Sequence, residues 1–251
     1  MRGEVCIGTG SILSFTSLLL LIFLHVGQIN DSHVPRTISL INVNMTSYQQ
    51  GIAATIAPDD VNGLYTDNAS TPLEQHLGLR QLYKFGLYGH CAYVNESAGL
   101  CSNTSAGNRF EPFNAIVGDM LPNFTSISTV ILSGSTFSDS DYLGNFSNGA
   151  YYLLLIGTIC AALALFTGFF KHTFGFLTST FLAAIGSIML LIGCTIWTVL
   201  IKKTQSVNNL LAGPAAAPVP LGIDVTIGNA LYLAWGAFAC LTVSLVPYMI
   251  M

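Results

Sequence analysis

The segment FGLYGHCAYVNESAGLC, residues 85–101, places two cysteines ten positions apart in a polar region that is rich in glycine and tyrosine. The chain on both sides of this segment stays polar from residue 28 to residue 149 and becomes almost entirely apolar outside that range. Of the 251 residues, 52% are hydrophobic and 8% are charged, whereas soluble domains carry roughly 25% charged residues. The composition therefore excludes a soluble globular protein and predicts a membrane protein with one large polar segment.

Four apolar stretches are long enough to cross a bilayer as helices, namely residues 7–27, 150–170, 174–201 and 228–250. A helix rises 1.5 Å per residue, so a hydrocarbon core of ~30 Å needs about 20 apolar residues. None of the four stretches contains Asp, Glu, Lys or Arg, each of which costs about 2.5 to 3.5 kcal/mol at the centre of a span. The sequence predicts four transmembrane helices. An alternative interpretation of the first stretch is a cleaved signal peptide.

The orientation of the chain follows from its glycosylation motifs. Seven asparagines begin an N-x-S/T motif, and all of them lie between the first and second predicted spans: Asn30, Asn44, Asn68, Asn95, Asn103, Asn123 and Asn145. Glycosylation acceptors belong to surfaces that enter the secretory lumen. We therefore expect residues 28–149 to be an extracellular or lumenal domain. With four basic and ten acidic residues between positions 30 and 149, this segment carries a net charge of −6.

The rest of the topology follows by alternation across the membrane. Residues 1–6 and the C-terminus are expected in the cytosol, residues 171–173 form a cytosolic turn, and residues 202–227 form a second outer loop. Lys202 and Lys203 then fall on the outer side, against the positive-inside tendency. Their long side chains can reach the lipid headgroups.

Cys91 and Cys101 are the only cysteines in the predicted outer segments. Two cysteines alone in an oxidising compartment predict one disulfide, which would stabilise the domain by about 3 kcal/mol on the chain-entropy model. The alternatives are two free thiols or a metal site that includes His90, for which no third or fourth ligand lies at suitable spacing.

The polar segment is predicted to be rich in β-structure. Residues 36–44 (RTISLINVN) and 129–134 (TVILSG) carry the β-branched and aliphatic residues typical of strands. Residues 83–94 (YKFGLYGHCAYV) predict a twisted or bulged strand, and residues 73–83 (LEQHLGLRQLY) a short helix. The predicted fold class is a membrane α-helical protein, a four-transmembrane-helix bundle with a small disulfide-tied extracellular β-rich domain.

Small residues recur every fourth position in three of the predicted spans. They are Cys160, Ala164 and Gly168 in the second span, Ser179, Ala183 and Ser187 in the third, and Gly236, Cys240 and Ser244 in the fourth. Such steps let helices approach closely. They indicate packing within the bundle or, alternatively, contact with a neighbouring protomer. The second outer loop, with AGPAAAPVPLGID at residues 212–224, is predicted to be extended and to act as a linker or, alternatively, as a contact surface.

The cysteine segment also carries a family resemblance. Gly86, Leu87, Tyr88, Cys91 and Cys101 resemble the claudin-type signature Gly-Leu-aromatic-x-x-Cys followed by a second cysteine. With RFEP at residues 109–112 and GNALYLAWGAFACL at residues 228–241, the chain is most similar to the fungal SUR/PalI tetraspan family. The Gly-Leu-Tyr-Gly-His-Cys form also fits the related fungal proteins of mating-induced fusion and calcium influx.

The resemblance implies a non-enzymatic structural protein of cortical plasma-membrane domains of the eisosome type, with effects on endocytosis and cell-wall integrity. Its expected partners are the lipid bilayer, further copies of itself or other cortical membrane proteins, and the cell wall; no nucleic acid, cofactor or metal is expected. A regulator of mating-induced membrane fusion or calcium influx is one alternative. A transporter or channel subunit is another, against which the charge-free spans argue. No nucleophile or acid–base constellation suggests an enzyme.

Overall fold

The structure is a computed structural model that describes residues 2–56, 61–95, 98–168, 173–214 and 216–249. The chain forms two compact units, each of which is described by itself. The helical unit comprises Met1–Val26, Gly149–Thr198 and Asn229–Met251, and the polar unit comprises Gly27–Asn148 and Val199–Gly228.

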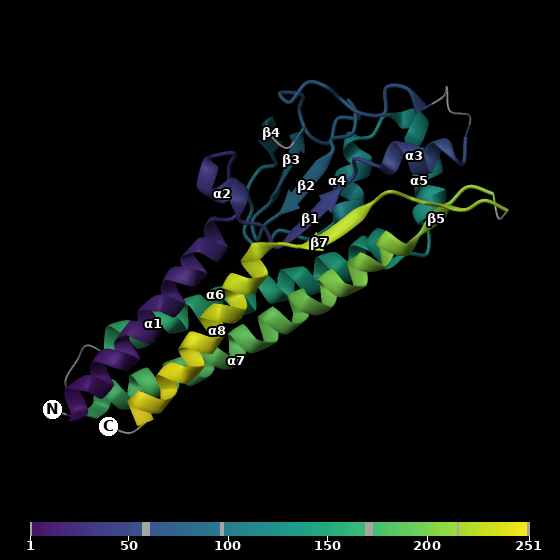
Figure 1. The fold of residues 1–251 in the computed structure, drawn as a ribbon. Coiled ribbons are helices and arrows are strands. Elements are labelled where there is room, and N and C mark those ends of the chain that lie inside the picture. The colour runs from purple at the N-terminus through teal and green to yellow at the C-terminus, as the bar shows by residue number, and fades with distance from the viewer. Residues whose placement is uncertain (1, 57–60, 96–97, 169–172, 215, 250–251) are drawn as a thin grey trace. The chain divides into compact units, whose positions relative to one another are not determined.

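The helical unit is built from α1 (Arg2–Val26), α6 (Ser140–Gly168), α7 (Thr173–Thr204) and α8 (Asn229–Met249) (Figure 1). All four are long and apolar enough to cross a membrane, which confirms the predicted four spans. The first turns of α6 and the last turn of α7 extend beyond the predicted spans and belong to the polar unit. The predicted cytosolic turn at 171–173 lies outside the described residues except for Thr173, where α7 begins.

The four helices of this unit pack in a ring, since side-chain hydrogen bonds join each neighbouring pair. These are Ser17 Oγ to the Ala237 carbonyl (2.8 Å), His25 Nε2 with Thr158 Oγ1 (2.9 Å), Ser179 Oγ to the Ala164 carbonyl, and Trp235 Nε1 to Thr198 Oγ1 (3.2 Å). Large apolar side chains remain exposed on every helix, among them Ile12, Phe166, Phe174, Phe181 and Tyr232. An apolar outer surface of this extent is what hydrocarbon requires.

The polar unit contains a five-stranded antiparallel sheet in the order β4-β3-β2-β1-β7 (Figure 1). Its strands are β1 (Ile41–Asn44), β2 (Leu82–Phe85), β3 (His90–Val94), β4 (Ala98–Cys101) and β7 (Asp224–Ile227). Because β7 pairs with β1, the segment predicted to be a linker contributes an edge strand. The two polar segments of the chain therefore fold together in one unit.

Short helices and one small hairpin complete the polar unit. They are α2 (His33–Thr37), α3 (Tyr48–Ala53), α4 (Pro112–Asp119), α5 (Pro122–Leu132), the 3-10 helices η2 (Thr136–Ser138) and η3 (Gln205–Asn209), and the strand pair β5 (Leu211–Ala212) and β6 (Val219–Pro220). The core is formed by side chains from the sheet and the segments around it, including Leu40, Ile41, Val43, Met45, Tyr48, Ile52, Leu79, Tyr83 and Phe137.

Two segments of this unit have another type of secondary structure than predicted. Residues 129–134 are not a strand, because α5 begins at Pro122, a favoured first helical residue, and buries one face every fourth residue at Phe124, Ser128 and Leu132. Residues 73–83 are not a helix. Glu74, His76 and Gly78 all have positive φ (60°, 56° and 120°), which no right-handed helix contains.

The predicted bulged strand at 83–94 is instead a β-hairpin, with β2 and β3 joined by a turn at residues 86–89. Of the predicted strand at 36–44, only Ile41–Asn44 is β-structure, because Arg36 belongs to α2.

Candidate functional site

The predicted disulfide is present and joins the adjacent strands β3 and β4. Cys91 in β3 lies directly opposite Cys101 in β4, and their sulfurs are 1.98 Å apart. The Ser102 amide donates to the His90 carbonyl (2.8 Å), so the cystine occupies the adjacent position without ladder hydrogen bonds, where opposing side chains come closest. The bond therefore fixes the register of the edge strand β4 against β3, with Cys91 buried and Cys101 half-buried.

The remaining motif residues form the turn between β2 and β3. The Gly86 amide donates to the Gly89 carbonyl (2.9 Å), and a Cβ at position 86 would collide with the carbonyl oxygen of Gly27. Leu87 is buried, and the carbonyl of the half-buried Tyr88 accepts a hydrogen bond from the Ser105 amide (2.9 Å). Glycine at 86 is thus required by the close approach of the backbone at Gly27, which a sequence pattern alone does not reveal.

Gln28 is a structural residue that sequence reasoning missed. Its side chain is fully buried, and its Nε2 donates to the carbonyls of Pro35, Arg36 and Ile38, each at 2.9 Å. Its Oε1 accepts a hydrogen bond from the Tyr93 hydroxyl on β3 (3.0 Å). A single amide therefore ties the start of the polar unit to its sheet. The only signal in the sequence is a polar residue directly after a long apolar run.

All seven predicted glycosylation acceptors lie in the polar unit. Six of them have exposed side chains: Asn30, Asn68, Asn95, Asn103, Asn123 and Asn145. Asn44 differs because it ends the inner strand β1 and is half-buried, and its Oδ1 accepts hydrogen bonds from the Thr46 amide (2.9 Å) and hydroxyl (2.6 Å). The seven sites are thus not equally accessible.

The small residues predicted to pack the helices divide into two groups. Ala164, Gly168, Ala183 and Ser187 are buried in the helical unit. Gly236 and Cys240 in α8 are only half-buried, although a Cβ on Gly236 would lie 3.4 Å from Leu20 Cδ1 in α1. The most buried face of α8 is formed instead by Ala230, Ala234, Ala237, Leu241 and Ser244.

Three glycines that were not among the predicted packing residues lie in close contact between α6 and α7. A Cβ on Gly157 would lie 2.7 Å from Leu190 Cδ2, and one on Gly193 would lie 3.0 Å from Leu154 Cδ2. A Cβ on Gly186 would lie 3.0 Å from Cys160 Cβ and 3.1 Å from Leu241 Cδ2. Glycine at these positions lets the helix backbones meet. The spacing of small residues was the right signal, but it did not identify which of them face a neighbour.

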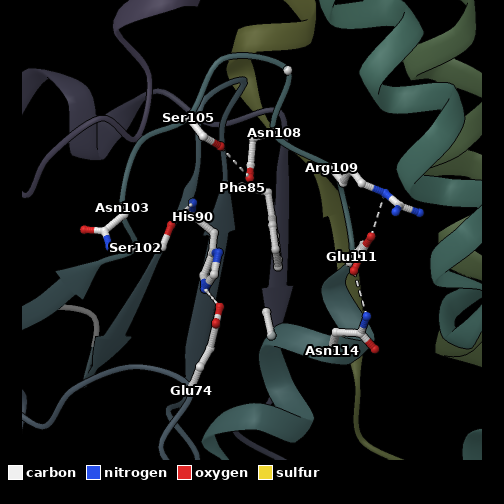
Figure 2. Close-up of a pocket in the computed structure, with 12 residues that line it drawn as sticks. Glu74, Phe85, His90, Ser102, Asn103, Ser105, Asn108, Arg109, Glu111 and Asn114 are labelled. Carbon is white, nitrogen blue, oxygen red and sulfur yellow. Dashed lines mark hydrogen bonds and ion pairs between the residues drawn. The ribbon is translucent and has the colours of Figure 1, made fainter.

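The polar unit contains an open pocket of about 530 Å³ beside the disulfide hairpin (Figure 2). Its lining residues are mostly polar and come from the segment before β2, from β2 and β3, from the chain between β4 and α4, and from α4 itself: Glu74, Phe85, His90, Ser102, Asn103, Ser105, Gly107, Asn108, Arg109, Glu111, Asn114 and Ala115. Within the described residues, no group of three or more His, Cys, Asp or Glu side chains is arranged to hold a metal ion. The pocket lies where the predicted family motif and RFEP segment meet.

His90 is the most unusual side chain of this pocket. Its side chain is 8% exposed, and Nε2 lies 3.7 Å from Glu74 Oε1, which is too far for a hydrogen bond. Among the described residues, this buried nitrogen has no hydrogen-bond partner. Burial and the nearby Arg80 charge lower the pKa of His90 to about 4, so the imidazole is neutral at neutral pH.

A buried ionic network lies next to His90. Arg80 and Asp119 form an ion pair at 3.0 Å with both side chains 1% exposed. The Tyr83 hydroxyl donates to the same carboxylate (2.8 Å), and the Glu74 amide donates to its other oxygen (2.6 Å). Burial, followed by the Asp119 charge, raises the pKa of Tyr83 well above its usual value. Because the carboxylate is satisfied from three sides, this network holds the segment of Glu74 against the sheet.

Four apolar helices, a small antiparallel sheet and a cystine within that sheet define a claudin-like tetraspan membrane protein. The family model described as SUR7/PalI family matches residues 6–246, and the chain belongs to this family of structural membrane proteins. A comparison with curated protein sequences found no match.

Proposed function

We propose that this protein is a non-enzymatic structural tetraspan that organises cortical domains of the plasma membrane, of the eisosome type, and thereby affects endocytosis and cell-wall integrity. The observation that carries the proposal is the SUR7/PalI match over residues 6–246. The helical unit agrees with it, since its contacts are made by small side chains and its outer surface is apolar on every helix. Such a bundle can associate laterally with other copies through van der Waals packing in the bilayer.

We also propose that the polar unit faces the lumen and then the cell exterior, with both termini in the cytosol. The support is the confinement of all seven acceptor motifs to this unit, six of them on exposed asparagines. A disulfide between Cys91 and Cys101 agrees with an oxidising compartment. Endoglycosidase treatment is expected to collapse a heterogeneous band into one species. A chain that shows no mobility shift, and whose polar unit is cleaved by protease added to the cytosolic side, would contradict this orientation.

The localisation experiment uses the full chain with a fluorescent protein fused to its C-terminus, expressed at native level in a fungal cell. We expect immobile cortical patches in vegetative cells, with slow fluorescence recovery after photobleaching. A single-span plasma-membrane protein with the same tag serves as the control and should recover fast. Uniform, freely exchanging fluorescence would contradict the proposal. Expression restricted to mating cells at the fusion tip would favour the fusion and calcium-influx alternative instead.

A further inference from the structure

The open pocket beside the disulfide hairpin has a chemistry that family membership does not explain. Its floor consists of buried residues, Phe85 (3% exposed), His90 (7%) and Ala115 (6%). Its wall carries hydroxyls and carboxamides with spare hydrogen-bonding capacity. Within the described residues, Asn108 Nδ2 and Asn114 Oδ1 have no partner, although Ser105 donates to Asn108 Oδ1 (3.2 Å) and Asn114 Nδ2 donates to Glu111 (2.7 Å). The volume of about 530 Å³ is typical of a small-molecule site.

The charges of the lining residues argue against an anionic ligand. Arg109 is the only lysine or arginine among the lining residues, and two carboxylates already engage it: Nε lies 2.8 Å from Glu111 Oε1, and Nη2 lies 3.2 Å from Asp141 Oδ1. His90 is neutral because burial and Arg80 lower its pKa to about 4. An anion would therefore meet Glu74 and Glu111 without a free cation to compensate them.

We propose that this pocket binds a saccharide through its hydroxyl groups. Hydroxyls both donate and accept hydrogen bonds, and so match a wall that presents carboxylates, amide oxygens, amide N–H groups and serine hydroxyls together. The buried His90 Nε2, which lacks a partner among the described residues, supplies the fixed point of recognition. A ligand that gives such an atom its missing hydrogen bond is favoured over one that leaves it unpaired.

The geometry at the pocket floor suits one hydroxyl in particular. His90 Nε2 and Glu74 Oε1 are 3.7 Å apart (Figure 2). One oxygen can lie about 2.8 Å from both atoms, which is ideal hydrogen-bond length. With the imidazole proton on Nε2, a hydroxyl oxygen there accepts from the N–H and donates to the carboxylate, whereas an ionised carboxylate or phosphate oxygen lacks the proton for the second bond.

The saccharide has two possible sources, because Asn103 both lines the pocket and begins an N-x-S/T motif. Its side chain is exposed and lies at the edge of the group of lining residues in Figure 2. The bound sugar is then either a glycan of this chain, attached at Asn103, or a separate saccharide such as a polymer outside the membrane. The two sources share the recognition chemistry, and an Asn103→Gln variant distinguishes them since glutamine keeps the amide and removes the acceptor.

The test uses the full-length protein in lipid nanodiscs, because many mild detergents carry sugar headgroups. Saturation-transfer difference NMR would be recorded with glucose, mannose, N-acetylglucosamine and their short β-linked oligomers, and with inorganic phosphate and choline as charged probes. Glu74→Ala and Asn114→Ala remove wall contacts at exposed positions and should leave the fold intact. Asp67→Asn, an exposed carboxylate that does not line the pocket, is the matched control. An intact disulfide and an unchanged melting temperature verify the fold of each variant.

We expect at least one sugar to bind saturably, with Kd raised about tenfold or more by Glu74→Ala and by Asn114→Ala, and unchanged by Asp67→Asn. If the Asn103→Gln variant binds the added sugar and the wild-type protein does not, the occupant is the chain's own glycan. If both the variant and the wild-type protein bind it, the occupant is a separate saccharide. The proposal is overturned if no sugar binds to either form, if Glu74→Ala leaves Kd unchanged, or if only choline or phosphate binds. The binding results do not depend on where the protein resides in the cell, and only the Asn103 comparison also requires the proposed lumenal orientation. Failure of the saccharide proposal and failure of the proposed function can therefore be distinguished.

Discussion

Each of the two units of this protein is stabilised internally by a different kind of interaction. In the helical unit, backbones meet at glycines such as Gly157 and Gly186, and the hydroxyls of buried serines donate hydrogen bonds to carbonyls of neighbouring helices. The polar unit is stabilised by a five-stranded sheet, a cystine and a buried network around Arg80 and Asp119. All ion pairs found among the described residues belong to the polar unit.

The difference follows from what surrounds each unit. Hydrocarbon provides no hydrophobic driving force between helices, so close packing and hydrogen bonds must hold the bundle. A small water-exposed unit has the hydrophobic effect but a limited core, and so it gains most from cross-links and buried polar networks. A change that harms one unit should therefore leave the other intact. Hydrogen exchange followed by mass spectrometry reports on both units in one sample, because protection is measured peptide by peptide.

The largest difference between the effects on the two units is expected from loss of the disulfide. Cys91→Ser or Cys101→Ser should destabilise the polar unit by about 3 kcal/mol, since the cross-link restricts the unfolded chain. Protection factors in β3 and β4 should fall about 100-fold, while those of the four long helices stay constant.

Equality of the two single variants and the double variant is the internal control of this prediction, because a bond lost from either end is the same loss. Cys194→Ser is a second control, since this buried free cysteine lies in the helical unit and not in the sheet. Unequal single variants, or equal loss of protection in the bundle, would contradict the prediction.

The contrast between the units also explains what the sequence revealed. The four spans depend on length and apolar composition, which are local properties of the chain, and the pairing of Cys91 with Cys101 depends on their isolation in one segment. The claudin-type residues Gly86, Leu87 and Tyr88 marked the turn that precedes β3, the strand of Cys91. These features were predictable because no long-range contact is needed to recognise them.

Most of the features that were missed depend on contacts between distant segments. Strand β7 joins the sheet by pairing with β1, with Asp224 opposite Asn44, and its short Asp-Val-Thr-Ile sequence does not indicate so distant a partner. The apolar residues 129–134 were assigned to a strand because short β-branched runs occur in both strands and helices. The pocket around His90 could not be predicted, since it needs the final positions of Glu74 and Asn114 relative to the hairpin.

A smaller loss of stability, confined to the helical unit instead of the polar unit, is expected from Gly186→Leu. A Cβ at this position already lies 3.0 Å from Cys160 Cβ and 3.1 Å from Leu241 Cδ2, so a leucine must separate α7 from α6 and α8. We expect the helical unit to lose about 2 kcal/mol, the typical effect of overpacking, with the polar unit unchanged. Gly149→Leu is the matched control, because a Cβ there meets no described atom within 4 Å. Equal melting temperatures of the helical unit in Gly186→Leu and Gly149→Leu would contradict this prediction.

The smallest effect is a pH dependence confined to the polar unit. Burial and the Arg80 charge lower the pKa of His90 from 6.5 to about 4 in the folded protein. The unfolded chain therefore binds the proton first as pH falls, and stability is lost progressively below pH 6.5 until about pH 4. Between pH 7 and pH 5.5 the polar unit should lose about 1 kcal/mol, seen as lower protection factors in β2 and β3.

Glu74 faces His90 and contributes with the opposite sign. Its pKa is raised by burial and by the Asp119 charge, so the folded state holds this proton more tightly than the unfolded chain and gains stability as pH falls. The window above pH 5.5 is chosen because a carboxyl titrates mainly below it. His90→Gln removes the titrating group and should flatten the profile, whereas His33→Gln, at an exposed position of the same unit, should not. If the wild type and His90→Gln lose protection in parallel, another group carries the pH dependence and the buried imidazole does not.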